Sequence, residues 1–259
     1  MRKKCAFCTR PAESREHIFS DWMLNMLPPN ERYALTERIA NGEYVKYKGR
    51  KVKLTAKVVC TPCNNNWMSD LEDQHLKPAM KDLLFEDNSA VLGPQEIVPI
   101  AAFAFKTLVL ANHKDLRTTL FFPSAQRTKF RLTLRIPDGV QVWMARREMI
   151  PGTYRGFWKS VSGETEKQTI HSFSNYICTW NFQNIVLQVL ATKWDDKRRR
   201  NIVPTVPFVQ DHYWDDASVL IWPSNGTSIQ WPPPCYLGDD TIETFRDRWD
   251  TIKVIIAGP

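Results

Sequence analysis

Two pairs of cysteines with the spacing Cys-x-x-Cys constrain this 259-residue chain more than any other feature. The first pair is Cys5 and Cys8, and the second pair, Cys60 and Cys63, follows after 51 intervening residues. Four thiolates suit tetrahedral zinc, and a site with four protein ligands leaves no position open for a substrate. We therefore expect a structural zinc ion that ties two distant segments together, with four reduced, metal-free cysteines as the alternative.

The composition favours a cytoplasmic protein with a polyanionic partner. No apolar segment follows the basic N-terminus, so no signal peptide is expected. No run of about 18 apolar residues occurs either, so no membrane contact is expected. In a reducing compartment, paired Cys-x-x-Cys motifs indicate metal binding rather than disulfides. The net charge of +7 favours a partner such as nucleic acid.

The positive charge is concentrated in residues 44–59, which contain six lysines or arginines and no acidic residue. We expect a hairpin around Gly49, whose second strand alternates apolar with mostly cationic residues. A cationic strand face suits contact with a phosphate backbone, although a solvated edge strand gives the same pattern. The candidate nucleic-acid-binding residues are Lys46, Lys48, Arg50, Lys51, Lys53 and Lys57.

The character of the sequence changes after Asn88, which predicts two domains, residues 1–88 and 89–259. Residues 95–112 predict one apolar helix, and short β-like runs separated by turn signals follow it. The expected strands are 118–122, 130–136, 140–145, 172–180 and 218–222; 184–193 reads as strand or helix, and 241–252 as a last helix. The second half is thus predicted to be an α+β accessory domain with antiparallel strands, whose role is open and which offers a surface for a protein partner.

The first half carries a resemblance in three short motifs. Cys5-Ala6-Phe7-Cys8, Glu16-His17-Ile18 and Cys60-Thr61-Pro62-Cys63-Asn64 together resemble the HNH endonuclease superfamily, in the subgroup with two Cys-x-x-Cys pairs. The stretch from Cys63 to Glu72 is similar to bacterial HNH proteins that share its Trp-Met-Ser segment. The resemblance covers about the first 80 residues and implies a ββα-metal module, in which a hairpin and a helix hold one divalent cation between them.

The resemblance also implies a role for each of three residues. Glu16, directly before the motif histidine, is a metal ligand, His17 is the general base, and Asn64 is the second metal ligand, with Asn65 or Asn66 as alternatives. The chemistry agrees, because a neutral imidazole can take a proton from water near neutral pH. The oxygen ligands of Glu and Asn suit Mg²⁺ or Mn²⁺ better than zinc.

The sequence departs from the family at two positions. Met68 stands where the zinc- or nickel-binding relatives carry a second histidine, so a histidine-rich site is not expected. Thr55 stands where many relatives have an asparagine that orients the motif histidine, and a backbone carbonyl is the expected substitute. Glu72 lies about 12 Å along a straight helix from Asn64, so we expect it to be solvated or an indirect partner of the site.

Three functions compete. The leading hypothesis is an HNH endonuclease that hydrolyses DNA phosphodiester bonds in phage defence or restriction, by family analogy. The second is a non-catalytic zinc-stapled module that binds nucleic acid or a protein. The third is a nuclease that acts on RNA or that waits for a partner to deliver its target.

Overall fold

The computed structural model describes residues 3–27, 33–38, 44–49, 54–84, 89–114, 119–148, 154–164, 172–194 and 216–248. Within these residues the predicted α+β class with antiparallel strands is confirmed. Two strands of the first half of the chain belong to the same large sheet as strands of the second half. The predicted division into two domains at residue 88 stays a prediction, although this sheet contains strands from both sides of that boundary.

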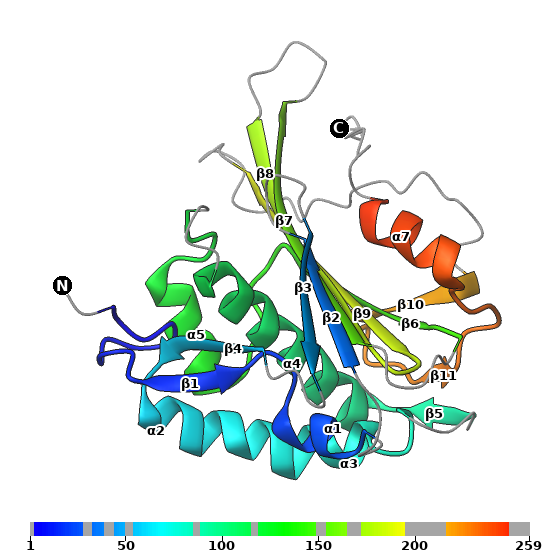
Figure 1. The fold of residues 1–259 in the computed structure, drawn as a ribbon, viewed down its shortest axis with the longest axis horizontal. Coiled ribbons are helices and arrows are strands. Elements are labelled where there is room, and N and C mark those ends of the chain that lie inside the picture. Colours follow the sequence, from blue (N-terminus) through cyan, green and yellow to red (C-terminus); the bar gives the residue numbers. More distant parts are fainter. Residues whose placement is uncertain are drawn as a thin grey trace.

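A seven-stranded sheet forms the centre of the molecule (Figure 1). Neighbouring strands pair antiparallel, except that β2 runs parallel to β7. In spatial order the strands are β10 (Ser218–Trp222), β6 (Val140–Arg146), β9 (Ile185–Trp194), β8 (Ser172–Phe182), β7 (Tyr154–Glu164), β2 (Tyr33–Arg38) and β3 (Tyr44–Gly49).

Strand β8 is buried on both faces of the sheet. Tyr176, Cys178 and Trp180 alternate along the strand and enter the larger hydrophobic core, whereas Ile177 enters a second core on the opposite face. Figure 1 shows helices α4 (Pro94–Lys114) and α5 (Ser124–Thr133) on one side of the sheet and α7 (Asp239–Asp247) on the other.

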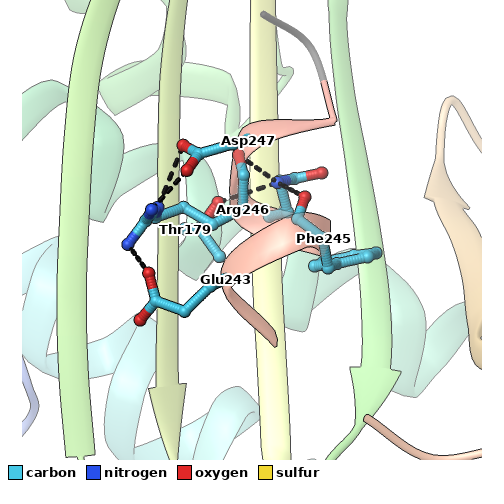
Figure 2. A network of polar contacts seen from close by, with 6 residues as sticks. Thr179, Glu243, Phe245, Arg246 and Asp247 are labelled. Carbon is cyan, nitrogen blue, oxygen red and sulfur yellow. Dashed lines mark hydrogen bonds and ion pairs between the residues drawn. The ribbon is translucent and has the colours of Figure 1, made fainter. Parts of the chain in front are cut away.

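Helix α7 is tied to the sheet by polar contacts as well as by packing. Gln188 Nε2 on β9 donates to Thr179 Oγ1 at 2.8 Å and to the carbonyl of Phe245 at 3.0 Å. Figure 2 shows Arg246 between Glu243 and Asp247, and it forms ion pairs with both. The buried amide of Gln188 therefore has partners on both the sheet and the helix, which fixes how α7 lies on this face.

A smaller unit lies beside the large sheet. Strand β1 (Ser14–His17) pairs antiparallel with β4 (Thr55–Val59), and a continuous helical run, 61–80, follows β4 directly. The helical run consists of α2 (Thr61–Cys63), η1 (Asn64–Met68) and η2 (Leu71–Leu76), both π-helical, and α3 (Lys77–Met80). A short helix, α1 (Asp21–Asn25), follows β1. The helical run thus follows a strand pair whose members, β1 and β4, are separated in the chain by α1, β2 and β3. The ββα-metal module implied by the resemblance stays a prediction.

The expected hairpin around Gly49 is wrong. Strand β3 pairs with β2 at the edge of the large sheet, whereas β4 pairs with β1 in the smaller one. The apolar alternation of β4 was predicted correctly, since Ala56 and Val58 are buried and Lys57 is exposed. Those apolar residues face the core beside α4, so it is burial against that helix, rather than a local turn, that sets the strand's orientation.

Helix α4 confirms the predicted apolar helix and joins the two units. It packs on β4, η2 and α3 on one side and on strands of the large sheet on the other. By length and composition it is apolar enough to cross a membrane, but most of it is buried inside the protein, as in a core helix. The core cluster around it contains residues from both halves of the chain. Strand β5 (Ala90–Leu92), which directly precedes α4 in the sequence, pairs antiparallel with β11 (Ile229–Trp231) from the last part of the described chain.

Two expected strands after α4 are wrong. Residues 124–133 form helix α5, where a strand was expected from 130, and the described part of 118–122 forms no strand. Helix α5 buries Arg127 and Phe130, which are three residues apart, so the helical period places both on the core side. Leu134 then ends the helix in a left-handed conformation with φ of 52°.

Candidate functional site

The four cysteines of the two pairs lie together. Their sulfur atoms are all within 4.8 Å of one another, with Cys8 Sγ 3.5 Å from Cys60 Sγ and 3.8 Å from Cys63 Sγ. Four sulfurs around a tetrahedral zinc ion, each about 2.3 Å from the metal, are about 3.8 Å apart. The predicted cluster is therefore confirmed, and its dimensions are those of a site that can bind a metal such as zinc.

Backbone hydrogen bonds hold both pairs in place. The turn that carries Cys5 and Cys8 is fixed by Cys5 N donating to Arg10 O and by Ala6 N donating to Val58 O, both at 2.8 Å. The second pair opens the helical run, where Cys63 N donates to Cys60 O at 3.1 Å. The cluster therefore fastens the segment before β1 to the start of the helix.

The free sulfurs do not ionise independently. A hydrogen bond with Cys63 is the main cause that lowers the pKa of Cys5 to about 4, and the same contact is the main cause that raises the pKa of Cys63. The protonated thiol of Cys63 thus stabilises the thiolate of Cys5 through this hydrogen bond. A bound dication would compensate the negative charges of the other thiolates as well. Metal binding to such a cluster therefore releases protons from its thiols.

A pocket of about 370 Å³ lies at the junction of β1 and the helical run. The three predicted catalytic residues, Glu16, His17 and Asn64, all line it. Glu16 and His17 come from β1, opposite Ala56 and Thr55 of β4 respectively. The other lining residues are Arg15, Asp21, Trp22, Asn65, Met68, Ser69, Glu72 and Asp73. The pairing of β1 with β4 and the start of the helix at the second cysteine pair bring the three residues together.

Asn64 fixes the helix to β1 through its side chain. Its Nδ2 atom donates to Ser14 Oγ at 2.8 Å and to the carbonyl of Arg15 at 3.2 Å. With the amide nitrogen used in this way, the Oδ1 atom is the one available to a cation. Thr61, the first helical residue, adds a 3.5 Å contact to Glu13.

His17 is accessible to a ligand in this pocket. Its side chain is 29% exposed, and its Nε2 atom lies 4.0 Å from Oδ1 of Asp21, the first residue of α1. Thr55, at the position where relatives carry an orienting asparagine, lies directly opposite His17 in the strand register. The carboxylate of Asp21 therefore lies beside the imidazole of His17, at a distance longer than a hydrogen bond.

Lys106 of α4 is a site residue that the sequence interpretation missed. Its buried Nζ donates to Glu16 Oε1 at 2.6 Å and forms a second ion pair with Glu72. Burial by itself lowers the pKa of Lys106, but attraction to the two carboxylates outweighs burial and raises the pKa overall. The ammonium is thus charged at neutral pH. Glu72 lines the pocket and is linked to Glu16 through Lys106, so of the two expectations for it the indirect partner holds rather than the solvated residue.

The pocket is acidic overall. Four carboxylates line it, those of Glu16, Asp21, Glu72 and Asp73. Arg15 in the lining and Lys106 beneath it supply two positive charges, which leaves two negative charges when His17 is neutral. An acidic pocket attracts a cation and repels a phosphate that arrives without one.

The donors present fit a hard divalent cation held by few protein ligands. Glu16 offers the carboxylate oxygen that Lys106 does not hold, and Asn64 offers Oδ1. Mg²⁺ commonly takes one or two protein ligands and keeps several waters. Among the described His, Cys, Asp and Glu residues, the four cysteines are the only group of three or more with metal-ligand geometry. A cation in the pocket would therefore depend on water and substrate for its remaining ligands.

The six basic residues do not form one described face. Lys57 is exposed on β4, beside β1. Lys46 and Lys48 lie on β3, in the other sheet. Arg50, Lys51 and Lys53 lie outside the described residues.

Comparisons of the chain with protein-family models, with curated proteins and with solved structures give no match. The resemblance to HNH endonucleases therefore remains an expectation from the sequence motifs. Function must be argued from the pocket, the cysteine cluster and the charges around them.

Proposed function

We propose that the protein is a metal-dependent HNH endonuclease that hydrolyses DNA phosphodiester bonds. The observation that carries the proposal is the convergence of Glu16, His17 and Asn64 on one pocket, across the joint between a β-strand pair and a helix. In this proposal Glu16 and Asn64 hold a divalent cation, Mg²⁺ or Mn²⁺. His17 acts as the general base.

The acidic charge of the pocket argues for metal dependence. A phosphodiester carries a negative charge, so four lining carboxylates disfavour its approach unless a cation is present. A bound divalent cation would stabilise the scissile phosphate and the leaving 3′ oxygen. The residues of the chain then have separate tasks, since His17 would take a proton from the attacking water and oxygens of Glu16 and Asn64 would hold the cation.

The cysteine cluster supports this arrangement from outside the pocket. With all four positions of a zinc ion filled by sulfur, it has no place for a substrate. It joins the turn before β1 to the first helical turn; Glu16 lies on β1 and Asn64 lies in that helical turn. We assign it a structural zinc ion that keeps the catalytic residues on the two elements aligned.

One observation favours the alternative, a non-catalytic zinc-stapled module that binds nucleic acid or a protein. Lys106 already satisfies one oxygen of Glu16 and pairs with Glu72, so the carboxylates are partly neutralised without any metal. Such a module would keep the cysteine cluster and the fold but would have no hydrolytic activity.

Plasmid nicking separates these functions. Zinc-loaded protein is incubated with supercoiled plasmid, or with RNA in a parallel arm, in the presence of Mg²⁺ or Mn²⁺. We expect divalent-dependent nicking that falls at least about a hundredfold in His17→Ala with unchanged zinc content. His75→Ala is the matched control, because His75 is an exposed histidine on η2 and does not line the pocket. DNA binding without cleavage under either metal would favour the binding module. Cleavage of RNA alone would show that the substrate is RNA rather than DNA.

A further inference from the structure

Lys106 is an unusual residue for its surroundings. It lies in the middle of the apolar helix α4 and its side chain is fully buried, next to Phe103, whose ring centre is 5.1 Å from Nζ. Lysine is among the residues least often buried, because losing the hydration of its charge is unfavourable unless charged partners compensate. The two glutamates are those partners.

The two carboxylates converge on one point from different elements. Glu16 belongs to β1 and Glu72 to η2, and each directs its Oε1 atom to the same Nζ. Two carboxylates so close together repel each other unless a cation lies between them. In this protein the cation is attached to the chain by the lysine side chain, and both glutamates also line the pocket above it.

We propose that the Lys106 ammonium is a built-in cation of the pocket, which fills the point between Glu16 and Glu72 where a second metal ion would otherwise bind. Lys106 is then a positioning residue that fixes the carboxylate of Glu16 and limits the site to one divalent ion. The identity of that ion rests on the proposed function, whereas the role of the ammonium between the two glutamates does not.

The charges explain why one ion remains favourable and a second does not. With Lys106 present, the pocket and the residues beneath it retain two negative charges, enough to attract one dication. A second dication would have to approach carboxylate oxygens that the ammonium already occupies, and like charges at such short range repel strongly. Removing the ammonium should therefore create a cation site at the place it leaves.

Two substitutions at the same position test this inference. Lys106→Ala leaves a space between the glutamates, whereas Lys106→Met fills that space with an apolar chain. Zinc-loaded proteins are titrated with Mn²⁺, bound manganese is counted by elemental analysis and electron paramagnetic resonance, and thermal unfolding is followed with Mn²⁺ or ethylammonium. Lys129→Ala is the control, since Lys129 is an exposed lysine on α5.

We expect one Mn²⁺ per chain in the unaltered protein and in Lys106→Met, and two in Lys106→Ala. Adding Mn²⁺ or ethylammonium should raise the Tm of Lys106→Ala by at least 5 °C more than it raises the Tm of Lys106→Met. If Lys106→Ala is unfolded alone, the same cations should restore its folded circular dichroism spectrum. Equal manganese counts in both variants, with no cation-dependent recovery, would overturn the inference. No Mn²⁺ in the unaltered protein but one in Lys106→Ala would uphold the inference and remove the proposed catalytic ion.

Discussion

The Nζ atom of Lys106 lies 2.6 Å from Oε1 of Glu16, although 90 positions of sequence separate the two residues. This contact joins α4, which belongs to the second half of the chain, to the strand that carries the proposed general base. The candidate site is therefore completed by the residues after position 88, and the accessory half contributes to the pocket directly. Its additional role, including any protein partner, stays a prediction.

The cysteine cluster gives a stability prediction. Cys63→Ser should lose the zinc and therefore the link between the turn that carries Cys5 and Cys8 and the helical run. The variant should be less stable, because the metal-binding free energy contributes to folding. We expect a loss of at least about 3 kcal/mol, roughly 10 °C in Tm for a chain of this size. Zinc analysis and thermal unfolding measure the two effects. Cys235→Ser is the control, since Cys235 lies outside the cluster, and an unchanged zinc content in Cys63→Ser would refute a four-cysteine site.

His113 gives a prediction for stability against pH. It lies near the end of α4 and contacts Arg127. Arg127 also donates to the carbonyl of Ala6, in the turn that carries Cys5 and Cys8. Burial, followed by the charges of Arg127 and Lys3, lowers the pKa of His113 from 6.5 to about 4. The folded protein thus keeps this imidazole neutral where the unfolded chain protonates it. Its contribution to stability is present above pH 6.5 and is lost as the pH falls towards 4.

The variant His113→Gln isolates this effect from the titration of cysteines and carboxylates, because glutamine can still accept a hydrogen bond from Arg127. The free energy of unfolding of the two proteins is compared by denaturant titration between pH 7.5 and pH 4.5. We expect the unaltered protein to lose on the order of 2 kcal/mol more than the variant over this range. If the free energy of unfolding depends on pH in the same way in the unaltered protein and in His113→Gln, then His113 titrates alike in the folded and unfolded states.

Lys57 gives a prediction for nucleic-acid contact. It is exposed on β4, the strand paired with the one that carries Glu16 and His17. If it neutralises one phosphate, Lys57→Gln should reduce the slope of log affinity against log salt by about 1, with little change in sequence preference. Fluorescence anisotropy with duplex DNA in the absence of divalent ions measures the slope. Lys129→Gln on α5 is the control, and a slope equal to that of the unaltered protein would exclude Lys57 from the contact.

The local parts of the site were predictable from the sequence. The two Cys-x-x-Cys pairs predict a cluster because thiolates at this spacing share one ion, and the cluster is present. Glu16, His17 and Asn64 were named from short motifs, and they line one pocket because β1 pairs with β4 and the helical run begins directly after β4, at the second cysteine pair. The apolar helix at 95–112 was also predictable, since no other element accommodates so long an apolar run.

The non-local parts were not predictable in the same way. Lys106 has its partners 90 and 34 positions away, so no local pattern identifies them, although one charge within an apolar helix was the available signal. The hairpin around Gly49 assumed that neighbouring strands pair, whereas β4 pairs with β1. The strand expected at 130–136 fails because Phe130 and its neighbours fit both strand and helix periods, and packing against Phe7 and Phe105 selects the helix.

Anomalous diffraction from crystals soaked in Mn²⁺ tests the central claim most directly, because it locates the cation relative to named atoms. We expect one manganese peak in the pocket, about 2.2 Å from an oxygen of Glu16 and from Oδ1 of Asn64, with Lys106 still between Glu16 and Glu72 and zinc at the four cysteines. A pocket without manganese at saturating concentration, or manganese between the two glutamates with Lys106 displaced, would contradict the claim.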